Sequence, residues 1–172
     1  MSTDFSRDEL LVKAIADIGA ALALQPSNSP DVSGWQHDIL QLGTSHPDPF
    51  IRAQLASTCS LRQLRLLASD RHVAVRAMCT ENPMIIDQDV QLRLAHDSDA
   101  SVLHALLDHC DPYREVVHVL INCQHWGVRY RLTLRNLTAD FLEQLAADPH
   151  PVVASSAKLR LTERSLSRGG EK

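Results

Sequence analysis

The chain has 172 residues, an apolar share of 44% and a formal net charge of −4. This length suits one domain, and this composition excludes wholesale disorder. Aromatic residues make up only 4% and there are 6 glycines, whereas Leu and Ala are abundant, so we expect an all-α protein. The net negative charge offers no global attraction for nucleic acid.

The cysteine pattern and the distribution of apolar residues indicate the cellular compartment. The 4 cysteines are isolated, with no CxxC motif. Met1 is followed by polar Ser-Thr-Asp rather than by the basic and apolar regions of a signal peptide. No apolar run approaches the ~20 residues that span a bilayer. We therefore expect a soluble cytoplasmic protein with reduced thiols and no membrane partner.

The first 44 residues are predicted to form an N-terminal helical cap. Residues 7–24 place apolar side chains at helical spacing, with Asp8 and Glu9 in the first turn, where acids favour the helix dipole. Residues 25–34 are rich in Pro and Ser and predict a loop. A short helix over 35–42, ended by Gly43, should present Trp35, Ile39 and Leu42 to the next unit.

Residues 45–161 repeat one phrase five times. Its anchor, Val75, has counterparts at Ile51, Val102, Val128 and Val153, in steps of 24, 27, 26 and 25 residues. Self-similarity at such a period indicates a solenoid. In each unit we expect a helix A from about the anchor, over 48–57, 73–81, 99–109, 125–134 and 150–161. A helix B should follow in the first four units, over 61–69, 87–96, 112–122 and 138–147, with N-caps at Ser60, Asp87, Asp111 and Thr138.

Equivalent positions of the units agree with one another. The position four residues after each anchor is apolar or small throughout, and so are the positions seven and eight residues before it. These columns predict the core. The position thirteen residues before the anchor is charged in every unit and should face water: Arg62, Asp89, Glu115 and Asp140.

Two phrases, Leu67-Ala-Ser-Asp70…Val75-Arg76…Glu81-Asn82-Pro83 and Leu145-Ala-Ala-Asp148-Pro-His-Pro-Val-Val153, resemble the leucine-rich repeat variant family. The resemblance covers residues 46–161. It implies a right-handed α-solenoid of about five short helix-pair repeats, and usually a binding scaffold. HEAT-like repeats share the Asp…Val-Arg phrase in longer units. From Thr162 the chain is polar, and we expect residues 162–172 to fray.

The chain departs from the family pattern at named positions. Cys123 replaces the acid and Leu103 and Ala154 replace the arginine, while Thr58, His109 and Arg135 replace the asparagine. Some members of the family carry an N-terminal iron–sulfur cluster on closely spaced cysteines. Residues 1–58 contain no cysteine, so this cofactor does not transfer, and we expect no cofactor.

An arginine follows the anchor in three units, as Arg52, Arg76 and Arg129. One interpretation is a ladder that binds phosphate or carboxylate ligands. The structural interpretation is favoured: each arginine pairs with the acid six residues back, Asp70 with Arg76 most clearly, and with acids of the next repeat. Such forks, bonded to carboxylates and helix-end carbonyls, would lock successive turns.

Histidines and cysteines raise a metal alternative. His109-Cys110 and Cys123-Gln-His125 lie in adjacent units and could meet, although zinc needs four converging ligands and the usual spacing is absent. His46, His72, His125 and His150 lie near the starts of the A helices, where ordinary turn residues are expected. No nucleophile, phosphate-loop or metalloprotease motif is present, so we expect no enzymatic activity.

The favoured function is a non-catalytic scaffold for a protein partner whose identity the sequence does not show. A stacked array exposes one continuous surface, and we expect it to use polar positions on the B helices: Arg62, Arg65, Asp89, Glu115, His118 and Glu143. The alternative is a nucleic-acid-binding module. It would require clustering of Arg62, Arg65, Arg71, Arg93, Arg114, Arg129, Arg131 and Arg135, and the net acidity opposes it.

Overall fold

The computed structural model describes residues 6–23 and 34–169, and over these ranges the protein is all-α, with eleven α-helices, two 3-10 helices and no strand. The α-helices are α1 (Arg7–Ala23), α2 (Gly34–Thr44), α3 (Pro49–Ala56), α4 (Leu61–Leu67), α5 (Val73–Met78), α6 (Gln88–Ala95), α7 (Ala100–His109), α8 (Arg114–Leu120), α9 (Trp126–Thr133), α10 (Ala139–Ala146) and α11 (Pro151–Gly169). The 3-10 helices η1 (Cys79–Glu81) and η2 (Pro83–Ile86) join α5 to α6.

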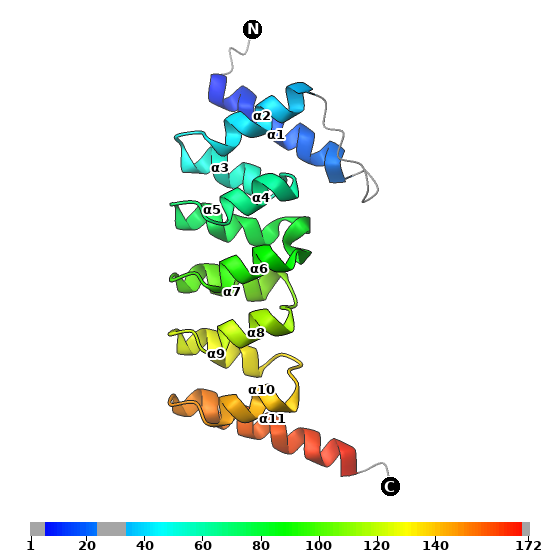
Figure 1. Cartoon of the computed structure of the whole chain (residues 1–172), viewed down its shortest axis with the longest axis vertical. Helices are drawn as coiled ribbons and strands as arrows, with labels where there is room; N and C mark the ends of the chain where they lie inside the picture. Colours follow the sequence, from blue (N-terminus) through cyan, green and yellow to red (C-terminus); the bar gives the residue numbers. More distant parts are fainter. Residues whose placement is uncertain (1–5, 24–33, 170–172) are drawn as a thin grey trace.

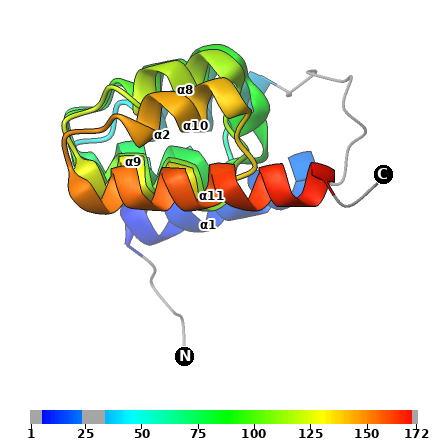
Figure 2. The same ribbon diagram turned by 90° about the horizontal axis from the view of Figure 1, so that it is seen from below.

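The helices lie in two layers. Figure 1 shows a column with α1 and α11 at opposite ends. Seen along that column, the odd-numbered α-helices form one layer and the even-numbered ones the other (Figure 2). We call these the A layer and the B layer. No helix of the described residues is long and apolar enough to cross a membrane.

The core lies between the layers and repeats along the column. All five anchors are at most 1% exposed. The position four residues after each anchor is fully buried, and the leucines eight residues before it are at most 2% exposed: Leu67, Leu94, Leu120 and Leu145. The charged column behaves as expected, since Arg62, Asp89 and Glu115 are exposed and Asp140 is half-buried. The anchor column, the column four residues after it and the leucine column are apolar because they are buried between the two layers.

Most helices begin where the sequence predicts, but α8 begins later. Asp48, Asp87 and Asp99 accept backbone N–H groups at the starts of α3, α6 and α7. The expected cap at Asp111 is wrong, because Cys110 is extended and Tyr113 is the N-cap of α8. The Tyr113 N–H donates to Gln91 Oε1 at 3.3 Å and its hydroxyl to the Ile86 carbonyl at 2.6 Å. These contacts to the preceding unit hold the segment out of the helix.

Gly43 does not end its helix, contrary to the prediction, because α2 runs through it to Thr44. Its role is close packing. A Cβ at this position would lie 3.1 Å from Leu55 Cδ2 and 3.2 Å from Ile15 Cδ1. Of the side chains expected to cover the first repeat, Ile39 packs against the core and Leu42 is exposed, while that of Trp35 lies outside the described residues.

The C-terminal helix extends further than the polarity of its sequence suggests. We expected fraying from Thr162, but α11 continues to Gly169. Two contacts explain this: Leu161 packs against the core, and the Arg164 guanidinium donates to the Leu137 carbonyl. In Figure 1 the end of α11 extends beyond the helices stacked on it.

Candidate functional site

The six residues predicted to bind a partner all lie exposed on B-layer helices. Their positions follow the column: Arg62 and Arg65 on α4, Asp89 on α6, Glu115 and His118 on α8, and Glu143 on α10. We call this surface the B face. It spans four helices and therefore presents an extended surface.

Polar contacts cross the B face from one helix to the next. Arg65 on α4 donates to Asp87 at 2.9 Å and to Asp89 at 3.4 Å. The Gln88 amide of α6 donates to Glu115 of α8 at 3.1 Å. Opposite charges are therefore held together, and the surface is of mixed sign. No hydrogen bond is found between Arg62 or Glu143 and the other four predicted residues.

Sequence analysis did not assign several members of the B face to partner binding, although it named Arg93 and Arg114 for the nucleic-acid alternative. Arg114 donates to Asp140 at 2.6 Å and lies 4.7 Å from the ring centroid of Phe141, against which His118 packs edge-on. A shallow, open depression between α4 and α6 is lined by Arg65, Asp89, Leu92, Arg93 and His96. The sequence did not indicate a partner-binding role for Arg93, because the equivalent residues of the other units, Leu66, Val119 and Gln144, are a mixture of apolar and polar types.

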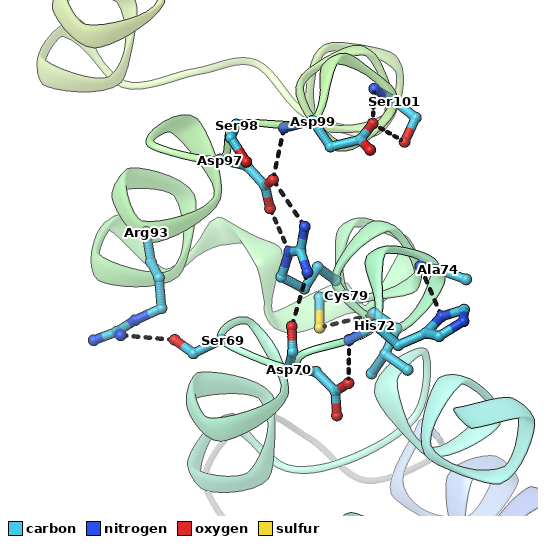
Figure 3. A network of polar contacts seen from close by, with 12 residues as sticks. Ser69, Asp70, His72, Ala74, Cys79, Arg93, Asp97, Ser98, Asp99 and Ser101 are labelled. Atoms are coloured by element: carbon cyan, nitrogen blue, oxygen red, sulfur yellow. Dashed lines mark hydrogen bonds and ion pairs between the residues drawn. The ribbon is translucent and has the colours of Figure 1, made fainter. Parts of the chain in front are cut away.

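The arginine column forms a buried ladder. Arg76 donates to the Asp97 carboxylate at 2.5 and 3.0 Å and to the Asp70 carbonyl at 2.9 Å. Figure 3 shows this network, in which Asp97 also accepts the Asp99 N–H. The Arg76 guanidinium therefore links the turn that contains Asp70, before its own helix, to the turn that contains Asp97 in the next unit.

The other two arginines make the same contacts. Arg52 donates to Asp70 at 2.7 and 2.9 Å and to the His46 carbonyl at 2.7 Å. Arg129 donates to Asp148 at 2.6 and 3.0 Å and to the Cys123 carbonyl at 2.6 Å. The expected side-chain pair of Asp70 with Arg76 is wrong, because the Asp70 carboxylate faces Arg52. The expected pairing with acids of the next repeat is what the structure contains.

The ladder has one missing rung, and both of its partners are absent together. Leu103 replaces the arginine of the third unit, and Cys123 replaces the acid of the fourth. Because the arginine of one unit pairs with the acid of the next, these are the two halves of one pair. A buried charge that has lost its partner is costly. Because both members of this pair are replaced, no such charge remains.

The pairs shift the ionisation of their members. Hydrogen bonds from Arg129 hold the pKa of Asp148 below its usual value. Burial acts to raise the pKa of Asp70, but hydrogen bonds from Arg52 and from the His72 N–H outweigh it, and the net shift is downward. The carboxylate hydrogen bonds raise the pKa of all three guanidinium groups. Ionised carboxylates therefore stabilise the folded chain.

A second set of contacts joins units at the opposite edge, after the A helices. The buried Asn82 amide donates to the Ala56 and Cys59 carbonyls of the preceding unit, at 2.8 and 3.0 Å. Where the pattern departs from asparagine, Arg135 donates to the equivalent Cys110 carbonyl at 3.4 Å. Here the arginine substitutes for the asparagine in bridging two units.

The cysteines and histidines do not gather. All four thiols are free, and each lies within hydrogen-bonding distance of a backbone carbonyl of its own segment. Burial raises the pKa of Cys59 to about 12 and that of Cys110 to about 11. No group of three or more His, Cys, Asp or Glu residues in the described ranges is placed to hold a metal ion. His46 and His72 accept backbone N–H groups in their turns.

The arginines invoked for nucleic-acid binding do not share one face. Arg62, Arg65, Arg93 and Arg114 lie on the B layer, whereas Arg129 is buried and Arg131 lies on α9 of the A layer, bonded to Asp108. The fold and this site define an all-α protein with repeated inter-unit contacts. No family model, no curated protein and no solved structure matches the chain.

Proposed function

We propose that the chain is a short right-handed α-solenoid of the leucine-rich repeat variant type, and that it is a non-catalytic scaffold for a protein partner. The recurrent contacts support the solenoid. Three arginine–aspartate pairs and the Asn82 and Arg135 contacts join one unit to the next at equivalent positions. In such an array each unit contacts only its neighbours, and the same positions of successive units are exposed along one surface.

The B face carries the functional proposal. Its six predicted residues are exposed on four successive even-numbered helices. At the helix-packing distance of about 10 Å, they follow a line roughly 30 Å long. A partner that contacts this line must be extended or large, as a protein surface or peptide is. The six residues comprise two bases, three acids and one histidine, and this mixture matches a partner of mixed charge better than it matches a phosphate backbone.

A charge-pattern experiment tests this function. Arg65→Glu alone would leave Asp87 beside a new acid, so it is combined with Asp89→Lys, which keeps opposite charges together while reversing their order. Glu143→Lys adds a change on α10. Partners captured from a lysate by the wild-type chain are identified by mass spectrometry, and their affinities are measured by calorimetry. The triple variant should bind at least tenfold more weakly.

The matched control is Glu81→Lys, which changes an exposed charge in η1, outside the B layer. It should keep wild-type affinity, and both variants should keep the wild-type melting temperature. Full affinity in the triple variant would show that the B face is only solvated surface. Salt-dependent binding of the wild-type chain to duplex DNA would favour the nucleic-acid alternative instead.

A further inference from the structure

The contact between α7 and α9, which we call the third joint, differs from the contacts between the other successive units. It is the place of the missing rung, where Leu103 and Cys123 stand instead of an arginine and an aspartate. Each of the other three joints contains such a pair, and its side chains are at most 18% exposed. The polar side chains that connect the units across the third joint are therefore different ones.

A histidine lies in the third joint where the first two units have alanine. His104 stands two residues after its anchor, which is the position of Ala53 and Ala77. Its ring is half-buried against the first turn of α9, since a Cβ added at Gly127 would lie 3.7 Å from His104 Nε2. The third joint therefore holds an ionisable ring at a position that is a methyl group in the first two units.

Arg131 on α9 reaches back to this ring. Its guanidinium lies 3.3 Å from His104 Nδ1 and also donates to the carboxylate of Asp108, one turn further along α7, at 3.2 Å. A guanidinium has donors only, so His104 Nδ1 must be the acceptor, and the neutral ring then carries its proton on Nε2. A second proton on the ring would place an N–H against an N–H and one cation against another. The contact therefore exists only while His104 is neutral.

Two other polar contacts of the third joint do not depend on a neutral ring. His125, in the turn before α9, has its Nε2 2.9 Å from the Ser98 carbonyl. A carbonyl accepts, so this nitrogen is the donor and keeps its proton when the ring is charged. Arg135 donates to the Asp111 carboxylate at 2.8 Å, and its guanidinium is charged at any pH near neutrality. His104 is thus the place in the joint where one proton turns an attraction into a repulsion.

The surroundings of His104 oppose its protonation. Burial lowers its pKa most, the Arg131 guanidinium and His125 lower it further, and the Asp108 carboxylate acts in the opposite direction without reversing the shift. Within the part of the chain that the structure describes, no charged group of α5, α6 or η1, which also pack against α7, is found to shift it. The folded joint therefore favours the neutral ring, and stability is lost as the pH falls below the ordinary histidine pKa of about 6.5.

We propose that His104 makes the third joint a pH-sensitive element of the column: when its ring takes up a proton from solvent, the contact with Arg131 is lost and α7 and α9 loosen from one another. The other joints do not respond, because arginine and aspartate have ordinary pKa values far from neutrality, at about 12.5 or above and about 3.9. α8 and α10 belong to the two units that the third joint connects. Its loosening therefore changes the spacing between the B-face residues on these two helices, Glu115 and His118 on one and Glu143 on the other.

The first test is the protonation state of His104 in the full chain. Long-range proton–nitrogen NMR correlations of the histidine rings are recorded from about pH 8 to about pH 5. At the upper end His104 should carry its proton on Nε2, and its pKa should lie below the ordinary value of about 6.5. Arg131→Leu should raise that pKa, because it removes the guanidinium that faces the ring. A proton on Nδ1 of neutral His104 would overturn the proposal, since that nitrogen could not then accept from Arg131.

The second test is hydrogen exchange of the full chain at about pH 8 and about pH 5, corrected for the intrinsic exchange rate and followed by mass spectrometry. Amide protection in α7 and α9 should fall severalfold at the lower pH, whereas protection in α3 and α5 should stay the same.

His104→Asn offers Arg131 an amide oxygen that accepts but does not titrate, so this variant should keep its protection at both pH values. The matched control is His96→Asn, which changes an exposed histidine at the end of α6 and should lose protection as the wild-type chain does. Unchanged protection in the wild-type chain would overturn the proposal. An equal loss along the whole column, or a loss that persists in His104→Asn, would overturn it as well.

Discussion

Replacing Arg129 by leucine should destabilise the protein far more than replacing an exposed arginine. The side chains of Arg129 and Asp148 are only 11% and 4% exposed. Arg129→Leu leaves Asp148 as a buried carboxylate without its guanidinium and also removes a donor from the Cys123 carbonyl. Breaking a buried pair by removing one partner costs about 3–5 kcal/mol. Asp148 keeps the His150 N–H, so we expect the lower end of that range.

The assay is thermal and urea unfolding followed by circular dichroism. At about 2–4 °C per kcal/mol for a chain of this size, a loss of ~3 kcal/mol lowers the melting temperature by roughly 6–12 °C. The control is Arg160→Leu, whose side chain is 41% exposed and whose partner Glu163 is 52% exposed. It should change the melting temperature little, because water already solvates both groups.

The chain itself supplies the compensating variant. Leu103 and Cys123 occupy the same two positions one rung earlier. Arg129→Leu combined with Asp148→Cys copies that rung and leaves no stranded charge, so the double variant should recover most of the lost stability. The double-mutant cycle should give a coupling energy of about 2 kcal/mol or more. Additive effects of the two substitutions would refute the assignment of Arg129 and Asp148 as a buried pair.

Three further predictions follow from the same contacts. The pKa values of Asp70 and Asp148 are lowered in the folded chain, so these two carboxylates stabilise it fully above their unfolded-state pKa of about 3.9. This stabilisation is lost as the pH falls through the folded-state pKa values, so the melting temperature should drop steeply below about pH 4. The drop should be less steep in Asp148→Asn. Asn82→Ala should cost about 1–3 kcal/mol in urea unfolding, because it removes the amide donor from two carbonyls in a buried site. Asn122→Ala, which removes one exposed bond to the His118 carbonyl, should have little effect. Gly43→Ala should lower the melting temperature, because its Cβ would press on the buried Leu55 and Ile15 side chains, whereas Gly127→Ala, with His104 no closer than 3.7 Å, should raise stability by about 0.5–1 kcal/mol.

The sequence by itself determined the helical class and the buried columns of the core. These are local properties: every anchor and every leucine column is apolar because each unit buries the same positions, and independent units report the same pattern. Most helix starts were predictable for the same reason: of the predicted caps, Asp87 accepts the Val90 N–H at the start of α6, and Ser60 and Thr138 stand at the N-caps of α4 and α10 without a side-chain cap bond. The six B-face residues were likewise placed on exposed helix surfaces by their columns.

Only the tertiary structure decided which groups meet. Asp70 and Arg76 are six residues apart, and that proximity suggested a pair, yet Arg76 reaches Asp97, 21 residues on. The reason is geometric: the side chain following the anchor points along the column to the next turn, and only the backbone carbonyl of Asp70 lies within its reach. Stacking likewise set the late start of α8 and the packing role of Gly43.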